Sequence, residues 1–577
     1  MKIQRRDLLK LAGGAALGAI FTPAPWKTLD DVSIWTQNWP WMPTPPRGQP
    51  VARFTTCTLC PAGCAVQARC VGGQPVRISG VRGGLCPAGL SGHHLPYHPG
   101  RVRSALHRGA PCKVEEAAAA VRRAAEAGQP AVLDQRPGRT ASLVYRRWLA
   151  SSGGLYLTPA AREDATLQAL GGGLAFDLGQ ARTVVSFGAP LLEGWGTPAR
   201  VLEARSQFHL VQVEARLSRT AAMADTWLPA KPGAEAALAL GFAHLLGAPS
   251  LERFTPEHVA ALTGVPAAQI REVARRMRDE APALVVGGGD PAGPFAREEE
   301  MAIAGLNRLA GAMGRTIVPR GEAPAPEGFD RLAPETALED VRDGSIRLLL
   351  IDETAAGNPM PWGYLKRKLA PGALVVVASS SLEGYARHAD YVLPAPVYME
   401  AVQDAPAACD SRTASFGVAP AILAPPEGVI EPADFVLRAA GESGSVADLI
   451  RQRADAIHEA GRGTVWNYAE GSETAVKEIA SADDLWKAFE SGARWNDVEA
   501  PANARPAPYA APDVAAIERR AEPAGFPLAL APCGWRGTAG PVSPLFSKLY
   551  EESHLRAAEG VSPSLPRRLL ARIGAAR

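Results

Sequence analysis

Short apolar runs alternate with alanine-rich, amphipathic segments along the middle of this chain, and this alternation limits the possible folds more than any other feature. The runs read as buried strands because they are apolar, short and rich in β-branched residues. They cover residues 130–135, 183–188, 209–214, 283–288, 347–352 and 373–380. Helical periodicity fills the intervals, for example in residues 113–128 and 297–314. Strands joined through helices form parallel sheets, so the pattern predicts an α/β fold with doubly wound parallel sheets.

Length and charge narrow the classes of function. A chain of 577 residues is too long for one hydrophobic core, and roughly three or four domains are expected. The 61 Lys and Arg residues nearly balance the 59 Asp and Glu residues, which leaves a net charge of +2. This balance predicts no nucleic-acid partner, because nucleic acids select basic surfaces.

The N-terminus has the features of an export signal. Arg5 and Arg6 precede an apolar run of 14 residues, from Leu8 to Phe21, which is too short to span a bilayer comfortably. Two adjacent arginines followed by Asp-Leu-Leu-Lys resemble a twin-arginine signal. We expect residues 1–25 to direct the chain to the periplasmic side of the cytoplasmic membrane, as a cleaved signal or as an anchor. A basic helix without a targeting role is the alternative.

Residues 26–49 form a tryptophan- and proline-rich segment. It contains Trp26, Trp35, Trp39 and Trp41 among several prolines. The prolines favour an extended backbone, and exposed tryptophans need a surface to bury against. That surface is expected to be the body of this chain, a partner subunit or a membrane interface.

Four of the eight cysteines are grouped near the N-terminus. Cys57, Cys60 and Cys64 lie within eight residues, and Cys86 follows 22 positions later. The first three are too close in sequence to pair well with one another as disulfides. Four thiolates fit a structural zinc ion or a [4Fe–4S] cluster, and the isolated fourth cysteine favours the cluster. Zinc and disulfides remain open from spacing alone. The other cysteines read as small buried residues; they are Cys70, Cys112, Cys409 and Cys533.

The cysteine spacing and the following "HPGRVRSALHRG" are similar to the opening domain of the molybdopterin oxidoreductases of the dimethyl sulfoxide reductase type. Five later blocks resemble the same family in the same order; they are residues 181–190, 216–246, 262–277, 348–359 and 386–401. The resemblance covers roughly residues 50–440. It implies a [4Fe–4S] cluster on the four grouped cysteines. It also implies loops that hold two pterin guanine dinucleotides.

The resemblance predicts a domain layout of a small iron–sulfur domain, two parallel-sheet domains and a truncated C-terminal β domain. The expected ranges are 50–110 for the iron–sulfur domain, 111–145 with 345–440 for the first α/β domain, 146–344 for the second, 441–525 for a connecting excursion and 526–577 for the truncated domain.

Several residues at the ends of predicted strands correspond to pterin-binding positions of the family. They are Gly188, Glu214, Gly233, Glu235, Gly288 and Asn358. Loops after parallel strands commonly bind ligands. Taken without the resemblance, the glycines among them read more readily as tight turns than as ligand-binding positions.

Three departures from the family pattern predict that molybdenum is absent. The family usually has Lys or Arg two residues after the fourth cysteine, where this chain has Ala88. No cysteine lies in residues 150–180 to ligate the metal, and the substitutes there, Ser151, Ser152 and Asp164, read as helix-end or turn residues. The expected closing domain stops soon after it begins, which leaves a large ligand exposed.

This combination resembles a narrower group, the molybdopterin-binding-like subunits of periplasmic quinone reductase complexes. The resemblance implies an electron-transferring or scaffolding subunit with one [4Fe–4S] cluster, with molybdenum bis-pterin guanine dinucleotide not expected. The implied partners are a ferredoxin-like iron–sulfur subunit, a multi-span quinone-binding membrane subunit and a multihaem cytochrome c. The alternative is a catalytic bis-pterin enzyme that acts on a small sulfur compound, an oxyanion or formate.

Overall fold

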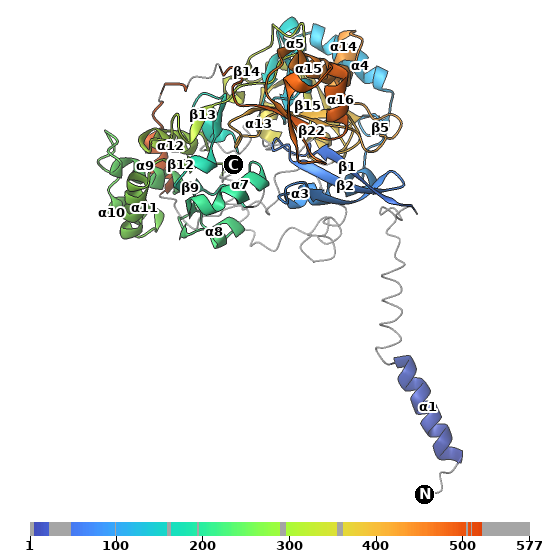
Figure 1. The fold of residues 1–577 in the computed structure, drawn as a ribbon, viewed down its shortest axis with the longest axis horizontal. Helices are drawn as coiled ribbons and strands as arrows, with labels where there is room; N and C mark the ends of the chain where they lie inside the picture. Colours follow the sequence, from blue (N-terminus) through green and yellow to red (C-terminus); the bar gives the residue numbers. More distant parts are fainter. Residues whose placement is uncertain are drawn as a thin grey trace.

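A computed structural model describes residues 5–21, 48–98, 100–158, 163–192, 195–288, 296–354, 362–382, 384–502, 506–508 and 510–521. Helix α1 (Arg5–Phe21) stands apart from the body, and its leucines Leu8, Leu9 and Leu11 are exposed (Figure 1). Among the described helices, none is both long and apolar enough to cross a membrane. The predicted tryptophan-rich segment and truncated C-terminal domain lie outside the described residues, apart from residues 48 and 49.

The body opens with a three-stranded antiparallel sheet. Its strands are β1 (Pro50–Thr56), β2 (Ala65–Val71) and β3 (Gln74–Gly80), paired in that order. The short helix α3 (Pro87–Ser91) and the 3-10 helix η1 (Gly92–Tyr97) follow. This unit lies within residues 50–110, for which the sequence predicts an iron–sulfur domain.

The largest sheet has eight strands and follows the predicted parallel pattern. Its order is β14 (Glu335–Thr336), β7 (Leu155–Leu157), β6 (Pro130–Asp134), β15 (Ile346–Asp352), β16 (Leu369–Ser379), β17 (Tyr391–Pro394), β4 (Leu106–His107) and β5 (Ala110–Pro111). The first six strands are parallel, and β4 and β5 are antiparallel additions at one edge.

Helices cover both faces of this sheet because side chains alternate along each strand. Leu348 and Leu350 of β15 pack with α4 (Val114–Glu126), α5 (Thr140–Ser152) and α14 (Pro432–Ala440). Leu349 and Ile351 face the other way, toward α13 (Trp362–Lys368) and the 3-10 helices η4 (Leu338–Asp340) and η5 (Gly384–His388).

A second, four-stranded parallel sheet has the order β11 (Thr226–Leu228), β10 (His209–Val213), β9 (Thr183–Phe187) and β12 (Ala283–Val286). One face packs on α9 (Glu235–Leu245), α10 (Pro256–Thr263), α11 (Ala267–Asp279), α12 (Ala296–Leu309) and α17 (Val514–Ala521). The shorter elements around this sheet are α6 (Ala165–Ala169), η2 (Leu178–Gln180), α7 (Pro198–Ala204), η3 (Arg205–Gln207), α8 (Arg219–Met223) and the antiparallel pair β8 (Leu174–Phe176) and β13 (Ile317–Pro319).

The predicted connecting excursion is folded over most of its length. A five-stranded antiparallel sheet has the order β18 (Gln403–Ala405), β19 (Ala414–Ala419), β22 (Ala493–Asp497), β20 (Thr464–Asn467) and β21 (Glu473–Ala475). Helices α15 (Val446–Ala460) and α16 (Ala482–Glu490) pack on it, and η6 (Val476–Glu478) follows β21. The prediction of an excursion was wrong here because these strands are too short for a clear period of two. The capping serines Ser445 and Ser481 were available signals.

All six predicted strands are confirmed, as β6, β9, β10, β12, β15 and β16. The predicted boundaries between the parallel-sheet domains are displaced, because β7 and β14 belong to the eight-stranded sheet. Strands β18 and β19, predicted as part of the first α/β domain, instead join the antiparallel sheet.

Candidate metal centre

The cysteine loop, residues 57–64, connects β1 to β2. The Cys57 amide donates to the Cys64 carbonyl at 2.8 Å and closes the base of the loop. Gly63 has φ +54°, a left-handed conformation that favours glycine, and an added Cβ there would lie 2.9 Å from the Ala405 Cβ. The loop is therefore compact and packed against the antiparallel sheet, without room for a larger residue at position 63.

The structure brings Cys86 to this loop. Cys86 is the residue just before helix α3. The pKa of the Cys57 thiol is raised well above its usual value, first by burial and then by Cys60, Cys64 and Cys86. The same mutual influence reaches Tyr398, whose pKa is raised by burial and then by Cys57, Cys64 and Cys86. The four grouped cysteines thus share one site.

The four thiols supply the number of ligands that either a structural zinc ion or a [4Fe–4S] cluster requires. Within the described part of the chain, no group of three or more His, Cys, Asp or Glu side chains is arranged to hold one metal ion. The seven described cysteines carry thiols rather than disulfides. The chemistry of these residues therefore fits a thiolate-ligated metal group.

The surroundings of the cysteine loop are apolar but contain unsatisfied polar atoms. Leu59, Ala62 and Val66 are buried beside the thiols. The Tyr398 hydroxyl is buried and interacts with the Cys57 thiol. The Nε atoms of Arg136 and Arg494, whose side chains reach the loop, have no hydrogen-bond partner among the described residues. Buried polar groups without partners are uncommon, so these two atoms indicate a site shaped for a further group.

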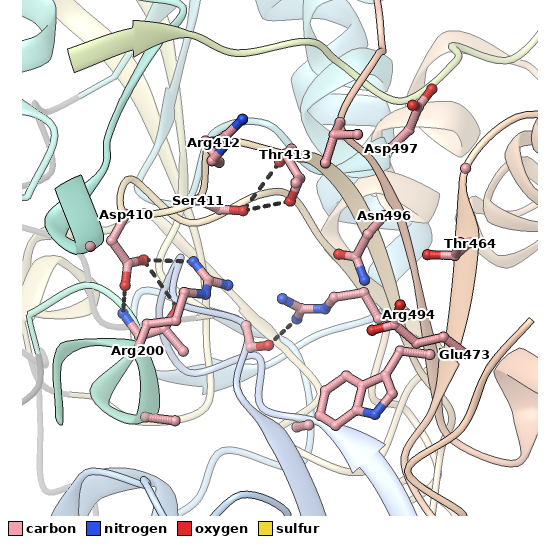
Figure 2. Close-up of a pocket in the computed structure, with 18 of the residues that line it drawn as sticks. Arg200, Asp410, Ser411, Arg412, Thr413, Thr464, Glu473, Arg494, Asn496 and Asp497 are labelled. Atoms are coloured by element: carbon pink, nitrogen blue, oxygen red, sulfur yellow. Dashed lines mark hydrogen bonds and ion pairs between the residues drawn. The ribbon is translucent and has the colours of Figure 1, made fainter. Parts of the chain in front are cut away.

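A cleft of about 990 Å³ opens beside the cysteine loop. Gly63 and Cys64 line it together with α7 and the antiparallel sheet. Figure 2 shows Arg200 paired with Asp410 on one wall, at 3.1 Å, and Arg494 reaching from the sheet toward the cysteine loop. Arg462 and Asp497 form another ion pair of the lining, at 3.0 Å.

The predicted pterin positions of the four-stranded sheet lie at one edge. Gly188, Glu214 and Gly288 follow the parallel strands β9, β10 and β12. The last residues of β9 and β10 are in register, and β12 ends one position earlier. Gly233, with φ +86°, and Glu235 follow β11 and begin α9. Asn358 lies outside the described residues. None of the described five lines the cleft beside the cysteine loop.

Two backbone amides and one carboxylate at this edge are bonded to neighbouring side chains. The Gly288 amide donates to Glu300 Oε1 at 2.7 Å, and the Gly287 amide donates to Thr166 Oγ1 at 3.0 Å. The Glu214 carboxylate accepts from Gln212 Nε2 at 3.1 Å and from Ser218 Oγ. A dinucleotide phosphate would need amide donors such as these. Here a buried carboxylate stands in that place, and burial raises the pKa of Glu300 to about 7.

The strand ends of the eight-stranded sheet hold a buried ionic network that the sequence analysis missed. Arg139 bonds to Asp352 at 2.6 Å and to Asp134 at 3.2 Å. Tyr145 donates to Asp352 and Tyr156 to Asp134, both at 2.8 Å. Burial alone would raise the pKa of Asp352, but Arg139 outweighs it and lowers that pKa to about 2. The described part of this edge thus contains an ionic network made by the chain's own side chains, although Gln135 Nε2 and Glu353 Oε2 beside it have no hydrogen-bond partner there.

Comparison with known proteins now adds to this geometry. No protein family model matches the chain. It is 29% identical over 519 residues to the menaquinone reductase molybdopterin-binding-like subunit of Nitratidesulfovibrio vulgaris, covering 79% of this chain and 75% of that protein. It is 24% identical over 441 residues to the thiosulfate reductase molybdopterin-containing subunit PhsA of Salmonella typhimurium, covering 60% of this chain and 58% of that subunit.

A solved structure shares the fold. Acetylene hydratase from Pelobacter acetylenicus matches with a TM-score of 0.57 at 13% identity, over 78% of this chain and 74% of that one. These likenesses fit the molybdopterin oxidoreductase family. The fold of this chain and its relatives agree with the resemblance predicted from the cysteine spacing and the five later blocks.

The departures from the molybdopterin oxidoreductase pattern can be located in the structure. Ala88 lies half-buried in the first turn of α3. The Ser151 and Ser152 hydroxyls donate to the Trp148 carbonyl at the end of α5, and Asp164 immediately precedes α6. These three candidates for a metal ligand are helix-end residues, as the sequence analysis predicted.

Proposed function

We propose that the chain is an electron-transferring or scaffolding subunit of a membrane-bound quinone oxidoreductase complex, with one [4Fe–4S] cluster and no molybdenum. The likeness to a menaquinone reductase molybdopterin-binding-like subunit over 79% of the chain carries this proposal. The four neighbouring thiols support the cluster, and the occupied strand ends support the absence of a pterin.

In this proposal Cys57, Cys60, Cys64 and Cys86 hold the cluster. A bound cluster supplies a one-electron carrier. Burial of Cys57 and Cys64 keeps water from the loop, and the Tyr398 hydroxyl is placed to donate toward the thiolates. Gly188, Glu214, Gly233, Glu235 and Gly288 then remain as fold positions that bind no pterin.

The proposed partners are a ferredoxin-like iron–sulfur subunit, a multi-span quinone-binding membrane subunit and a multihaem cytochrome c. The proposed location is the periplasmic side of the cytoplasmic membrane, reached by the twin-arginine route. Replacing both Arg5 and Arg6 with Lys should leave the chain in the cytoplasm, because a receptor reads the arginine pair. Efficient periplasmic delivery of that variant, measured by fractionation, would contradict this location.

The second candidate is a catalytic bis-pterin reductase that acts on a small sulfur compound, an oxyanion or formate. The likeness to a thiosulfate reductase subunit favours it. It requires a dinucleotide at strand ends where Glu300 and the Arg139 network now stand. The first candidate needs no such rearrangement.

Reduction of the purified full-length chain tests the proposal. Dithionite should bleach a broad visible absorption and give the EPR signal of a reduced [4Fe–4S] cluster. A preparation that contains iron but shows neither change would contradict the cluster.

A further inference from the structure

The buried arginines of this chain fall into two classes. Five arginine side chains are buried in the described residues; they are Arg101, Arg136, Arg139, Arg453 and Arg494. Three of them form ion pairs, namely Arg101 with Glu400, Arg139 with Asp134 and Asp352, and Arg453 with Asp404. Arg136 and Arg494 form no ion pair with any carboxylate that the structure describes. A buried charge without a counter-charge is costly, so each of these two arginines needs an explanation.

Both unpaired arginines contact the cysteine loop. Arg136 Nη1 donates to the carbonyl of Thr58, the residue after Cys57. Arg494 Nη2 donates to the carbonyl of Gly63, the residue before Cys64. Arg136 comes from the loop after β6 and Arg494 from β22, so two different sheets each contribute one guanidinium to the same short loop.

The structure makes room for these side chains. A Cβ at Gly63 would lie 2.8 Å from Arg494 Nη2, and a Cβ at Gly417 would lie 3.1 Å from Arg494 Nε. The Nε atoms of both Arg136 and Arg494 are buried without a hydrogen-bond partner. Arg136 is 3% exposed and Arg494 5% exposed, so both guanidinium groups are removed from bulk water.

The protein around Arg136 compensates its charge only in part. Its Nη2 donates to the neutral amide oxygen of Gln403 at 3.3 Å. Burial and then Arg139 lower the pKa of Arg136 to about 10, although Asp352, Glu431 and Asp404 act to raise it. None of these three carboxylates forms an ion pair with Arg136 in the described structure, and Nη1 is directed at the cysteine loop.

We propose that Arg136 and Arg494 are positioning residues that compensate the negative charge of a tetrathiolate cluster on the cysteine loop and raise its reduction potential. This inference rests on the proposed [4Fe–4S] cluster. A cluster ligated by four thiolates is anionic and becomes more so on reduction, so nearby cations and hydrogen bonds stabilise the reduced form. The same two arginines replace the cation that Ala88 does not supply.

The test compares charge-removing and charge-keeping substitutions in the full-length chain. Arg136→Gln and Arg494→Gln remove a cation, and Arg136→Lys and Arg494→Lys keep one. Arg462→Gln is the matched control, since Arg462 lines the same cleft and pairs with Asp497 without contacting the cysteine loop. The readouts are iron and sulfide per chain and the midpoint potential from an EPR-monitored redox titration.

Each glutamine variant should shift the midpoint potential to more negative values or lose part of its cluster. The lysine variants should stay closer to the wild type, and Arg462→Gln should match it. Unchanged potentials and iron contents in both glutamine variants would overturn the inference while leaving the cluster proposal intact. Equal effects of Gln and Lys, or failure of both glutamine variants to fold with iron and sulfide supplied, would make the arginines structural and would also overturn it. A wild type without iron would instead contradict the proposed function.

A second measurement separates charge from simple hydrogen bonding. Arg494→Gln should lower the melting temperature of the iron-loaded chain and raise that of the iron-free chain, because the cation has a counter-charge only in the first. A purely structural bond to Gly63 predicts a lower melting temperature in both forms, and that result would overturn the inference.

Discussion

The cysteine loop and the strand ends of the parallel sheets are the two places where this fold can hold a cofactor. They differ in the partners that their buried polar and charged groups have. At the strand ends, Glu300, Thr166 and the Arg139 network pair with several of the polar groups from within the chain, although Gln135 Nε2, Gln212 Oε1 and Glu353 Oε2 have no hydrogen-bond partner among the described residues. At the cysteine loop, the Nε atoms of Arg136 and Arg494 are buried without partners, and neither arginine pairs with a carboxylate that the structure describes. The described ionic groups of the first region are therefore paired within the chain, whereas the second region contains two buried cations without an ion-pair partner.

This difference shows that a shared fold does not imply a shared ligand. The hydrogen-bond partners of the buried polar groups indicate whether a ligand can bind. The glycines after β9 and β12 keep positive φ at Gly188 and Gly288, as ligand-binding loops often do. Their backbone shape alone therefore suggests a ligand. The hydrogen-bond partners of the backbone amides indicate whether a phosphate can bind there. An amide that already donates to a buried carboxylate is not available to a phosphate.

Loss of a cluster ligand should give the largest effect. Cys60→Ser should remove most of the iron, because thiolate ligation holds the cluster. Cys112→Ser is the control, since Cys112 lies outside the cysteine loop and is half-buried. Iron per folded chain, measured by colorimetric assay, checks this prediction. Equal iron in both variants would place the centre elsewhere.

Removing the cation of the strand-end network should lower the free energy of unfolding without loss of the cluster. Arg139→Met leaves Asp134 and Asp352 buried without their cation, which should lower the free energy of unfolding by about 3–5 kcal/mol. Arg438→Met is the control, because Arg438 pairs with Glu115 at the surface, where a pair is worth about 0–1 kcal/mol. Urea unfolding measures the difference. A loss of iron per folded Arg139→Met chain would show that the two regions are not independent.

The filled strand end should also make stability depend on pH. Glu300, Glu353 and Glu431 each have a pKa raised to about 7 from an ordinary value of 4.5. Between these pH values the folded chain holds protons that the unfolded chain has released, so the free energy of unfolding falls as pH rises from about 4.5 to about 7.

Glu300→Gln should reduce the fall in the free energy of unfolding between these pH values by at most about 3 kcal/mol. The exposed Glu459→Gln is the matched control. Urea unfolding at several pH values in that window measures the slope. An unchanged slope for Glu300→Gln would contradict a buried, protonatable carboxyl at the end of β12.

Ala88→Lys should have the smallest effect. The added cation beside Cys86 should raise the cluster potential slightly, since Arg136 and Arg494 already supply positive charge to the cysteine loop. It should create neither pterin binding nor substrate reduction, because the strand ends remain filled. Pterin analysis and quinone-linked turnover of the assembled complex are the measurements. A many-fold change in turnover would mean that electrons pass from the cluster to a second cofactor.

The sequence predicted the parts of the fold that are locally encoded. The six buried strands are apolar runs with β-branched residues, and the cysteine loop is visible from spacing alone. The short strands β18 and β21 have three residues each and carry no recognisable period. Their pairing depends on neighbours distant in sequence.

The polar contacts that distinguish the two regions could not be predicted locally. Arg494 and Gly63 are 431 positions apart, and Arg136 and Thr58 are 78 apart. Neither arginine stands in a motif, and both look like ordinary surface residues in the sequence. Only the fold shows that they are buried, unpaired and directed at the cysteine loop.

The most direct test of this account is to measure iron, molybdenum, tungsten and pterin in one purified sample of the full-length chain with its native complex. The account predicts about four iron atoms per chain on the cysteine loop. The iron content of the Cys60→Ser variant corrects this value for other iron-containing subunits. The account also predicts no molybdenum, tungsten or pterin. Stoichiometric molybdenum or tungsten with pterin would contradict it, as would iron that does not fall in that variant.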